Sequence, residues 1–317
     1  MKILLAPMEG VVDPVMRDLL TTVGGIDRCV TEFVRVSERV LPSRVFYRLS
    51  PELHVGGVTS SGVPVFVQLL GSEPDVMAAN ALRAATLGAP GIDLNFGCPA
   101  KTVNRNRGGS ILLKEPDLVN LIVSAVREAV PDNIPVTAKM RLGYEDKALA
   151  IDNAVAIADA GASEICVHAR TKVEGYRPPA HWSWIAQIRN RVDIPVVANG
   201  DVFSTSDYQL CREVSGCENV MVGRGLLQRP DLARGIVAQR DGVSYVPMDW
   251  ATVVSMLYRF FESVQQQVAA KHAPGRIKQW LSFLQKQYPQ AKRLFELIKK
   301  EMHIEGVRSV FQQHSCL

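Results

Sequence analysis

The sequence contains no apolar run long enough to cross a membrane. Its 317 residues are 47% hydrophobic and 21% charged, which is ordinary for a globular protein. A membrane-spanning helix needs about 18 or more consecutive apolar residues, and none of the apolar runs approaches that length. The first segment, MKILLAPMEG, has too short an apolar part for a secretory signal. We therefore expect a cytoplasmic protein that does not associate with membranes.

Cysteine pairs at metal-binding or redox spacing are also missing. The six cysteines stand at positions 29, 98, 166, 211, 217 and 316, and no two of them form a C-x-x-C motif. This pattern argues against a thiolate zinc site and against a disulfide framework. We expect reduced thiols, as in most cytoplasmic proteins, and no bound metal.

Short β-branched or apolar runs, bounded by Gly, Pro, Asn or Asp, recur along the first 225 residues. Between most of them lie helical patterns with apolar residues at i, i+3 and i+4. Eight strands that alternate with helices predict a (β/α)8 TIM barrel over residues 1–243. A doubly wound open sheet is the alternative, but the segment after the first strand, LLAPMEGVVD, lacks the G-x-G-x-x-G fingerprint expected there. The predicted strands cover residues 3–8, 28–34, 63–70, 91–97, 134–142, 164–171, 194–201 and 219–225.

After the last strand the pattern becomes almost wholly helical. The segment VSYVPMDW is typical of a linker, with Asp249 as the cap of the next helix. We predict a small C-terminal all-α helical domain of three to four helices over residues 244–317. Residues from Trp250 onward carry a net charge of +6, which leaves −2 for residues 1–249. A basic domain on a slightly acidic body indicates a polyanionic partner, although a solvated helical surface is the alternative.

Polar side chains stand at the carboxyl end of almost every predicted strand, where such barrels carry their active sites. Lys139 and Arg141 share one face of a strand, and two buried cations are costly unless an anion meets them. Gly200, Gly223 and Arg224 suit a phosphate at the ends of the last two strands. A heterocycle on the same ligand could meet Lys139, His168 and Gln68, so FMN fits this layout. Taken alone, Gln68 could be a satisfied core amide and His168 a structural histidine.

Several motifs together resemble the tRNA-dihydrouridine synthases, a family of FMN-dependent barrel enzymes with a C-terminal helical domain. The resemblance rests on LLAPMEG (4–10), TEF (31–33), NFGCP (95–99), the Lys139 and Arg141 pair, HARTK (168–172), NGD (199–201) and GRG (223–225). The stretch KHAPGRIKQWL (271–281) resembles the subgroup that modifies uridine 16 of tRNA.

The resemblance implies reduction of a uracil C5=C6 bond in tRNA, with NADPH as the reductant of tightly bound FMN. It also implies that Cys98 supplies the proton for C5. A free thiol has a pKa near ~8.5 and so remains mostly protonated at neutral pH, which suits a proton donor. The alternative for Cys98 is a small buried apolar residue. From the strand ends and the resemblance, the cofactor set is Pro7, Met8, Glu9, Gln68, Lys139, His168, Asn199, Gly200, Asp201, Gly223 and Arg224.

A second set of residues is predicted to contact the RNA. A uridine inside a folded tRNA must be extruded into the pocket, where Asn95, Arg141 and Arg170 are candidates for base contacts. Tyr176 is placed to stack or hydrogen-bond nearby. The predicted contacts to the RNA backbone are Arg35, Lys101, Arg105, Arg107, Lys271, Arg276 and Lys278. We expect a monomer. A small-molecule flavin reductase and a non-catalytic RNA-binding barrel remain the alternatives.

Overall fold

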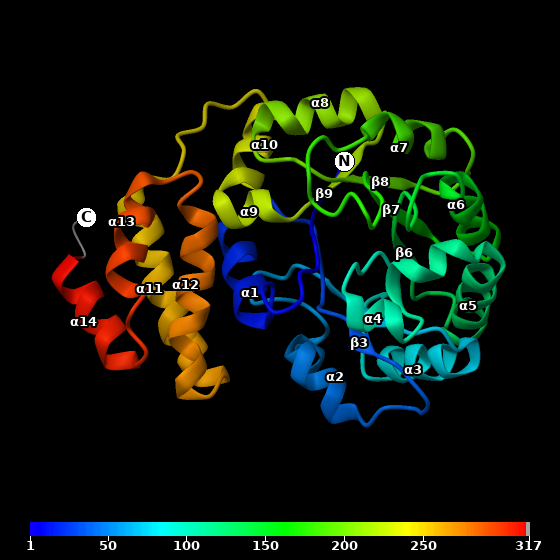
Figure 1. Ribbon diagram of the computed structural model, residues 1–317, viewed down its shortest axis with the longest axis horizontal. Helices are drawn as coiled ribbons and strands as arrows, with labels where there is room; N and C mark the ends of the chain where they lie inside the picture. The colour runs from blue at the N-terminus through cyan, green and yellow to red at the C-terminus, as the bar shows by residue number, and fades with distance from the viewer. Residues whose placement is uncertain (315–317) are drawn as a thin grey trace.

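Eight parallel strands close a barrel in the computed structural model, which describes residues 1–314 (Figure 1). The sheet runs in the order β2-β1-β9-β8-β7-β6-β5-β4, and a pairing of β2 with β4 closes the ring. The closure excludes the open doubly wound sheet and confirms the predicted barrel. Each predicted strand is present. The strands are β1 (Ile3–Leu5), β2 (Arg28–Val30), β4 (Val65–Leu70), β5 (Ile92–Phe96), β6 (Val136–Arg141), β7 (Glu164–His168), β8 (Val196–Asn199) and β9 (Asn219–Val222).

One predicted strand, residues 28–34, is interrupted. The chain forms β2, leaves the ladder around Glu32, and pairs again with the end of β4 as β3 (Val34–Arg35). The break has a local cause: Glu32 turns its carboxylate to the backbone N–H of Gly10 in the loop after β1. The interruption therefore joins two neighbouring loops at the mouth of the barrel.

Amphipathic helices cover the outside of the barrel. In α5, Val119, Ile122, Val123 and Val126 are fully buried, and each such side chain contributes about 1.5–3 kcal/mol of burial free energy. The helices around the barrel are α1 (Pro14–Val23), α2 (Ser43–Leu49), α3 (Pro74–Thr86), α4 (Lys101–Arg105), α5 (Pro116–Ala129), α6 (Ala150–Asp159), α7 (Trp182–Arg189), α8 (Thr205–Ser215), α9 (Arg224–Gln228) and α10 (Leu232–Arg240). Two 3-10 turns, η1 (Pro51–Val55) and η2 (Gly109–Lys114), complete this part.

The remaining described helices pack beside the barrel, at the left of Figure 1. They are α11 (Trp250–Gln267), η3 (Ala270–His272), α12 (Ala273–Leu284), α13 (Pro289–Ile298) and α14 (Ile304–His314). As predicted, Asp249 caps α11 by accepting a hydrogen bond from the N–H of Thr252 at 2.9 Å. The buried Trp280 donates to the carbonyl of Leu227 at 3.1 Å and so ties α12 to the barrel.

A second tie comes from Arg276 on α12. Its guanidinium donates to the carbonyls of Gly10 (2.6 Å) and Val11 (2.9 Å) and to the carboxylate of Asp13 (2.7 Å). The RNA contact that we predicted for Arg276 stays a prediction. Its side chain is only 14% exposed and is already bound to acceptors of the barrel, so it fastens the helical part to the loop after β1.

Among residues 1–314, none of the helices combines the length and the hydropathy that a membrane span requires. The five cysteines of this range are free thiols, and Cys316 lies outside the described residues.

Candidate active site

A cavity of about 480 Å³ lies at the carboxyl ends of the barrel strands. This volume is within the range of small-molecule and cofactor sites. All eleven predicted cofactor residues line it, and so do Asn95, Cys98, Arg141 and Tyr176. Because the strands are parallel, their carboxyl ends meet at one mouth, and residues far apart in sequence converge there.

Cys98 stands at the corner that follows β5, and its backbone is held from both sides. The Asn95 Oδ1 atom accepts hydrogen bonds from the N–H of Gly97 (3.0 Å) and of Cys98 (2.9 Å). The Cys98 carbonyl accepts from Ser110 Oγ at 2.9 Å and from Asn104 Nδ2 at 3.0 Å. A side chain at Gly109 would come within 2.8 Å of this carbonyl, so the chain can pass behind the corner only as glycine.

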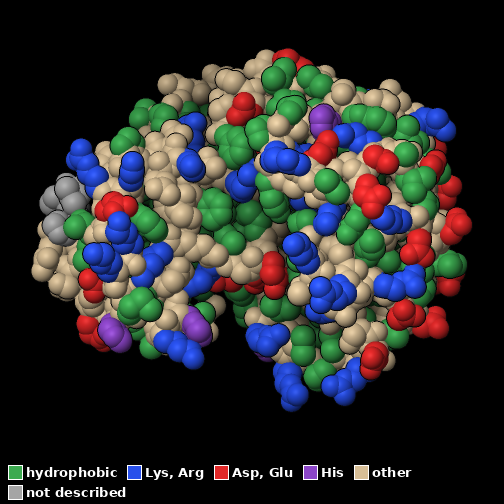
Figure 2. Space-filling view, viewed as in Figure 1, with side chains coloured by type: hydrophobic (Ala, Val, Ile, Leu, Met, Phe, Trp, Pro, Cys, Tyr) green, Lys and Arg blue, Asp and Glu red, His purple; other side chains and the backbone are tan. Residues whose placement is uncertain are grey.

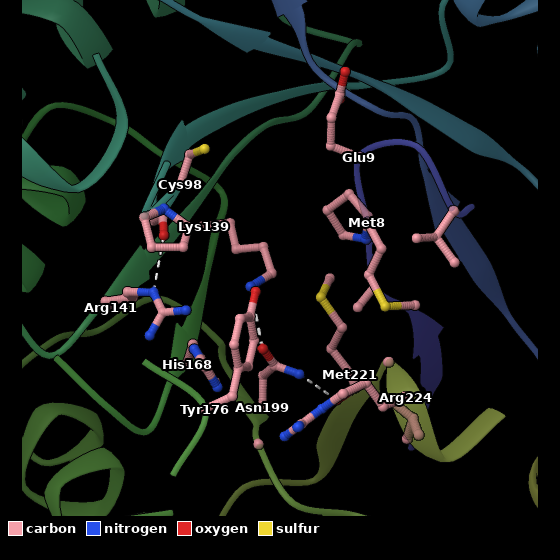
Figure 3. A pocket seen from close by; sticks show the side chains of 18 of the residues that line it. Met8, Glu9, Cys98, Lys139, Arg141, His168, Tyr176, Asn199, Met221 and Arg224 are labelled. Atoms are coloured by element: carbon pink, nitrogen blue, oxygen red, sulfur yellow. Dashed lines mark hydrogen bonds between the residues drawn. The ribbon is translucent and has the colours of Figure 1, made fainter. Parts of the chain in front are cut away.

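The Cys98 thiol is half-buried, and burial raises its pKa above the usual range. The N–H of Ala100 opposes the rise, Glu9 adds to it, and Arg141 opposes it. Burial has the largest effect, so the thiol remains protonated at neutral pH. A protonated thiol at the wall of a cavity can give a proton to a bound molecule. In Figure 3 Cys98 and Glu9 lie at one end of the pocket, and Arg224 and His168 lie toward the other.

Between the two ends lies a cation. The Lys139 ammonium donates to Asn199 Oδ1 at 3.1 Å, and Asn199 Nδ2 donates to the carbonyl of Met221 at 2.8 Å (Figure 3). Asn199 is thereby fixed with its oxygen toward the lysine. These two hydrogen bonds, which link β9 to β8 and β8 to β6, hold the Lys139 ammonium in the middle of the cavity, where it can face an electron-rich ring.

The far end of the cavity is built for an anion. Asp201 holds the guanidinium of Arg224 at 3.3 Å and also pairs with Arg170. A side chain at Gly223 would lie 3.4 Å from Ala6 and 3.6 Å from the sulfur of Met8, so glycine leaves room for a ligand at the backbone. Gly200 has a φ of +127°, a conformation that other residues rarely adopt.

The pKa of His168 is sensitive to the charge at this end of the cavity. Its ring is buried, and its pKa is lowered well below the usual value, first by burial and then by the positive charges of Arg141, Lys139, Arg170 and Arg224. The imidazole is therefore neutral at physiological pH and has one donor and one acceptor nitrogen. Four cations around a neutral ring create a positive potential that favours an anionic ligand.

Tyr176 lies across this positive region. Its ring is 5.2 Å from the Arg141 guanidinium and 4.9 Å from that of Arg224. The backbone beside it is held by Arg141, which donates to the carbonyls of Thr171 (3.0 Å) and Gly175 (2.9 Å). Cation–π contacts with both guanidiniums therefore fix the Tyr176 ring at the cavity wall.

Glu9 is the titratable group of the cavity mouth with the strongest consequence for stability. Burial, and secondarily the charge of Glu32, raises its pKa from 4.5 to about 7. The folded state therefore binds the proton more tightly than the unfolded state. Stability from this group is fully present below pH 4.5 and is lost as pH rises through about 7.

We therefore expect Glu9→Gln to gain stability relative to the wild type between about pH 5 and pH 8, since the amide does not ionise. Scanning calorimetry at equal cofactor content measures the difference in Tm at each pH. The matched control is Glu38→Gln, which removes an exposed carboxylate outside the cavity. Parallel pH curves for Glu9→Gln and wild type would contradict the assignment.

A family model described as "Dihydrouridine synthase (Dus)" matches residues 4–313 of this chain. The chain belongs to the dihydrouridine synthase family. Dihydrouridine synthases are flavin-dependent oxidoreductases that convert uridine to dihydrouridine in tRNA, and this chain is an enzyme of that kind. The resemblance inferred from the strand-end motifs is thereby confirmed.

Two relatives and one solved structure illustrate the similarity. A tRNA-dihydrouridine(16) synthase of Pseudomonas syringae pv. tomato is 57% identical over 307 residues, which cover 97% of both chains. One from Neisseria meningitidis serogroup A is 52% identical and covers 98% of this chain and 93% of the relative. Histamine dehydrogenase from Rhizobium sp. 4-9 superposes with a TM-score of 0.57 at 16% identity, over 82% of this chain and 48% of that one. At this identity the structural likeness shows the barrel fold alone.

The structure corrects one residue of this dihydrouridine synthase's predicted base-binding set. Arg170 has no solvent exposure and does not line the cavity. Its guanidinium pairs with Asp201, and its Nε donates to the carbonyl of Arg177. Arg170 therefore supports the anion-binding end from behind, and the predicted base contact is withdrawn.

The predicted RNA-backbone residues do not line the cavity. Figure 2 shows Lys and Arg side chains on both sides of the hollow between the barrel and the C-terminal helices. Arg107 is partly neutralised by Glu115 at 3.1 Å, and Lys278 is half-buried. The predicted residues that are exposed are Arg35, Lys101, Arg105, Arg107 and Lys271.

The sequence analysis did not name every cavity residue as a site residue. Phe33, Phe203 and Phe283 supply apolar wall, and Glu32 adds a second carboxylate at the mouth. Phe33 and Glu32 belong to the TEF motif, whose position at the end of the predicted strand 28–34 was the available signal. Phe283 comes from α12, and no sequence pattern shows which barrel loop a distant helix will face.

Proposed function

We propose that this enzyme reduces uridine 16 of tRNA, with FMN as its flavin, NADPH as the reductant and Cys98 as the proton donor. The observation that carries the proposal is the half-buried, protonated thiol of Cys98 in the same cavity as Lys139 and an anion-binding end. Position 16 is supported by the names of relatives that are 57% and 52% identical over nearly the whole chain.

The residues present fit FMN rather than a flavin without phosphate. Arg224 and the glycine backbone at 200 and 223 would hold the phosphate, and Lys139 would face the polar edge of the ring system. Asp201 is one carboxylate shared between the guanidiniums of Arg170 and Arg224, and Arg224 lines the cavity, so this end keeps an excess of positive charge. A positively charged end of this kind is costly unless an anion binds there.

When bound, the flavin supplies the hydride that C6 of the uracil ring accepts. The chain's part is to place the ring and to hold the proton for C5 at Cys98 Sγ. After the proton leaves, the N–H of Ala100 and the charge of Arg141 stabilise the thiolate, because both favour its ionised form. The second hydrogen of Asn95 Nδ2 and the Nη2 group of Arg141 would donate to the carbonyls of the uracil edge.

The working unit that we propose is a monomer in the cytoplasm, with residues 1–243 as the catalytic barrel and residues 244–317 as the tRNA-binding part. The cavity supports this, because Phe283 of α12 completes its wall from the same chain. NADPH and the extruded base would use the one open mouth in turn.

The charged rim predicts a salt-dependent grip on the RNA backbone. Lys101 and Lys271 are exposed, one on the barrel and one on the helical part. Each phosphate contact contributes about 0.7–0.9 to the slope of log Kobs against log salt. We expect the double variant Lys101→Gln/Lys271→Gln to reduce that slope by roughly 1.4 to 1.8, with NADPH oxidation unchanged.

The matched control for this pair is Lys2→Gln/Arg191→Gln. Lys2 and Arg191 are exposed at the amino-terminal ends of β1 and β8, on the opposite side of the barrel. This variant removes the same charge and should leave the slope unchanged. Equal slopes for both double variants would mean that the rim does not contact the RNA.

Mapping dihydrouridine in tRNA from cells that lack this gene tests the proposed function. The modification should disappear at position 16 and persist at other positions. Loss at another position would overturn the assignment of the site. An unchanged tRNA would favour the small-molecule flavin reductase, which needs no charged rim.

A further inference from the structure

Three polar side chains meet inside the barrel, below the cavity. The register of the sheet pairs Gln68 of β4 with Asp93 of β5, and Asp93 with Thr137 of β6. All three are buried, with exposures of 1%, 2% and 3%. The Asp93 carboxylate accepts from Thr137 Oγ1 at 2.6 Å and from Gln68 Nε2 at 2.7 Å.

The hydrogen bonds continue from this layer to the corner at Cys98. Gln68 Oε1 accepts from Asn95 Nδ2 at 2.7 Å, and Asn95 Oδ1 accepts from the N–H of Cys98 at 2.9 Å. A carboxylate can only accept, and a backbone N–H can only donate. The two amides between them therefore have one orientation that satisfies every bond.

We propose that Asp93 is a positioning residue that sets the orientation of Gln68 and Asn95 and thereby holds Cys98 in place for proton transfer. The proposal rests on the proposed role of Cys98. Asp93 itself touches neither cavity nor substrate, since it does not line the cavity.

The energetics argue for a role beyond packing. Barrel interiors are filled by apolar side chains, and burying a carboxylate costs free energy. Burial raises the pKa of Asp93 to about 6, against the opposing effects of Gln68, Thr137, Arg28 and Lys139. The group is thus ionised at neutral pH, in the acceptor-only form that the chain of hydrogen bonds requires.

The substitution Asp93→Asn keeps the shape of the side chain and replaces one of its two acceptor oxygens by a donor NH2 group. If the Thr137 hydroxyl still donates to the new amide oxygen, the amide nitrogen faces Gln68 and forces it to turn. Asn95 must turn with it and then presents N–H groups to the N–H of Cys98. Two N–H donors cannot hydrogen-bond to each other, so the backbone at Cys98 loses the hydrogen bond that fixes it.

A second substitution restores the polarity. In Asp93→Asn/Gln68→Glu, the new amide nitrogen donates to one carboxylate oxygen, and the other oxygen accepts again from Asn95. The net charge of the layer is that of the wild type. Thr137→Val is the matched control, because it disturbs the same buried layer without reversing any amide.

The experiment separates the two half-reactions in anaerobic single turnovers of the FMN-loaded variants. NADPH reduces the flavin in one, and tRNA oxidises it in the other. Asp93→Asn should slow the tRNA step by about 100-fold, as expected for a displaced reacting group, and leave the NADPH step near the wild-type rate. Thr137→Val should keep both steps. Because the double variant also changes Gln68 of the predicted cofactor set, its tRNA step is compared with its own NADPH step, and the ratio of the two rates should recover most of its wild-type value.

An independent readout uses flavin-free protein. Iodoacetamide alkylation of Cys98, followed by peptide mass spectrometry, should be faster in Asp93→Asn than in wild type and Thr137→Val, since the released corner exposes the thiol. The proposal is overturned if Asp93→Asn keeps the wild-type tRNA step or if Thr137→Val loses as much. It is also overturned if the ratio of the tRNA step to the NADPH step is no higher in the double variant than in Asp93→Asn.

Cys98→Ala distinguishes failure of this inference from failure of the proposed function. If Cys98→Ala is inactive with tRNA while Asp93→Asn is fully active, Cys98 donates the proton and Asp93 does not position it. If Cys98→Ala keeps its tRNA step, the proposed role of Cys98 fails first, and the inference about Asp93 falls with it.

Discussion

Cys98→Ala should slow uridine reduction by about 10²- to 10⁴-fold, the usual contribution of a positioned general acid. Burial keeps the Cys98 thiol protonated at the cavity wall, and alanine has no proton to give. Flavin binding and flavin reduction by NADPH should remain, because neither needs a proton for C5. Stopped-flow measurement of the two half-reactions separates these effects.

Cys211→Ala is the matched control for that experiment. Cys211 is also a free thiol whose pKa is raised by burial, to about 12, but it lies in α8, outside the cavity. The control should keep both half-reactions. If Cys98→Ala reduces uridine as fast as Cys211→Ala does, Cys98 has no part in the chemistry.

Arg224→Ala should weaken FMN binding by about 10- to 100-fold, the range expected for one lost charge-assisted hydrogen bond to phosphate. Asp201 holds the Arg224 guanidinium at the anion-binding end of the cavity. Arg224→Ala therefore removes the charge that is directed at the phosphate. Riboflavin has the same ring system without the phosphate. Its affinity should change little.

Fluorescence titration of flavin-free protein with both ligands provides this comparison. The ratio of the two affinities matters more than either value, because a general loss of structure would weaken both. An equal loss for FMN and riboflavin would show that Arg224 does not contact the phosphate.

Much of the cavity could be predicted because strand order alone brings the carboxyl ends of parallel strands together. Lys139, His168 and Asn199 needed only to be recognised as polar residues at strand ends, and all three line the cavity. The same reasoning placed Cys98 at the mouth. In a closed barrel, local sequence and position at the site are directly linked.

The partners of individual charges could not be predicted in this way. Arg170 and Arg276 both lie in motifs that suggested RNA contacts, but one is buried against Asp201 and the other binds the loop after β1. The sequence shows the charge and length of an Arg or Lys side chain, whereas the group that this side chain binds depends on tertiary packing. The relay from Asp93 to Cys98 escaped notice for the same reason, since its bonds cross three strands.

The most direct test of the account is a reaction of purified protein with an unmodified tRNA transcript, FMN and NADPH. The account predicts dihydrouridine at position 16 alone, and no product from a transcript in which uridine 16 is replaced by cytidine. Dihydrouridine at a different position, or an unmodified transcript despite a flavin that NADPH reduces, would contradict it.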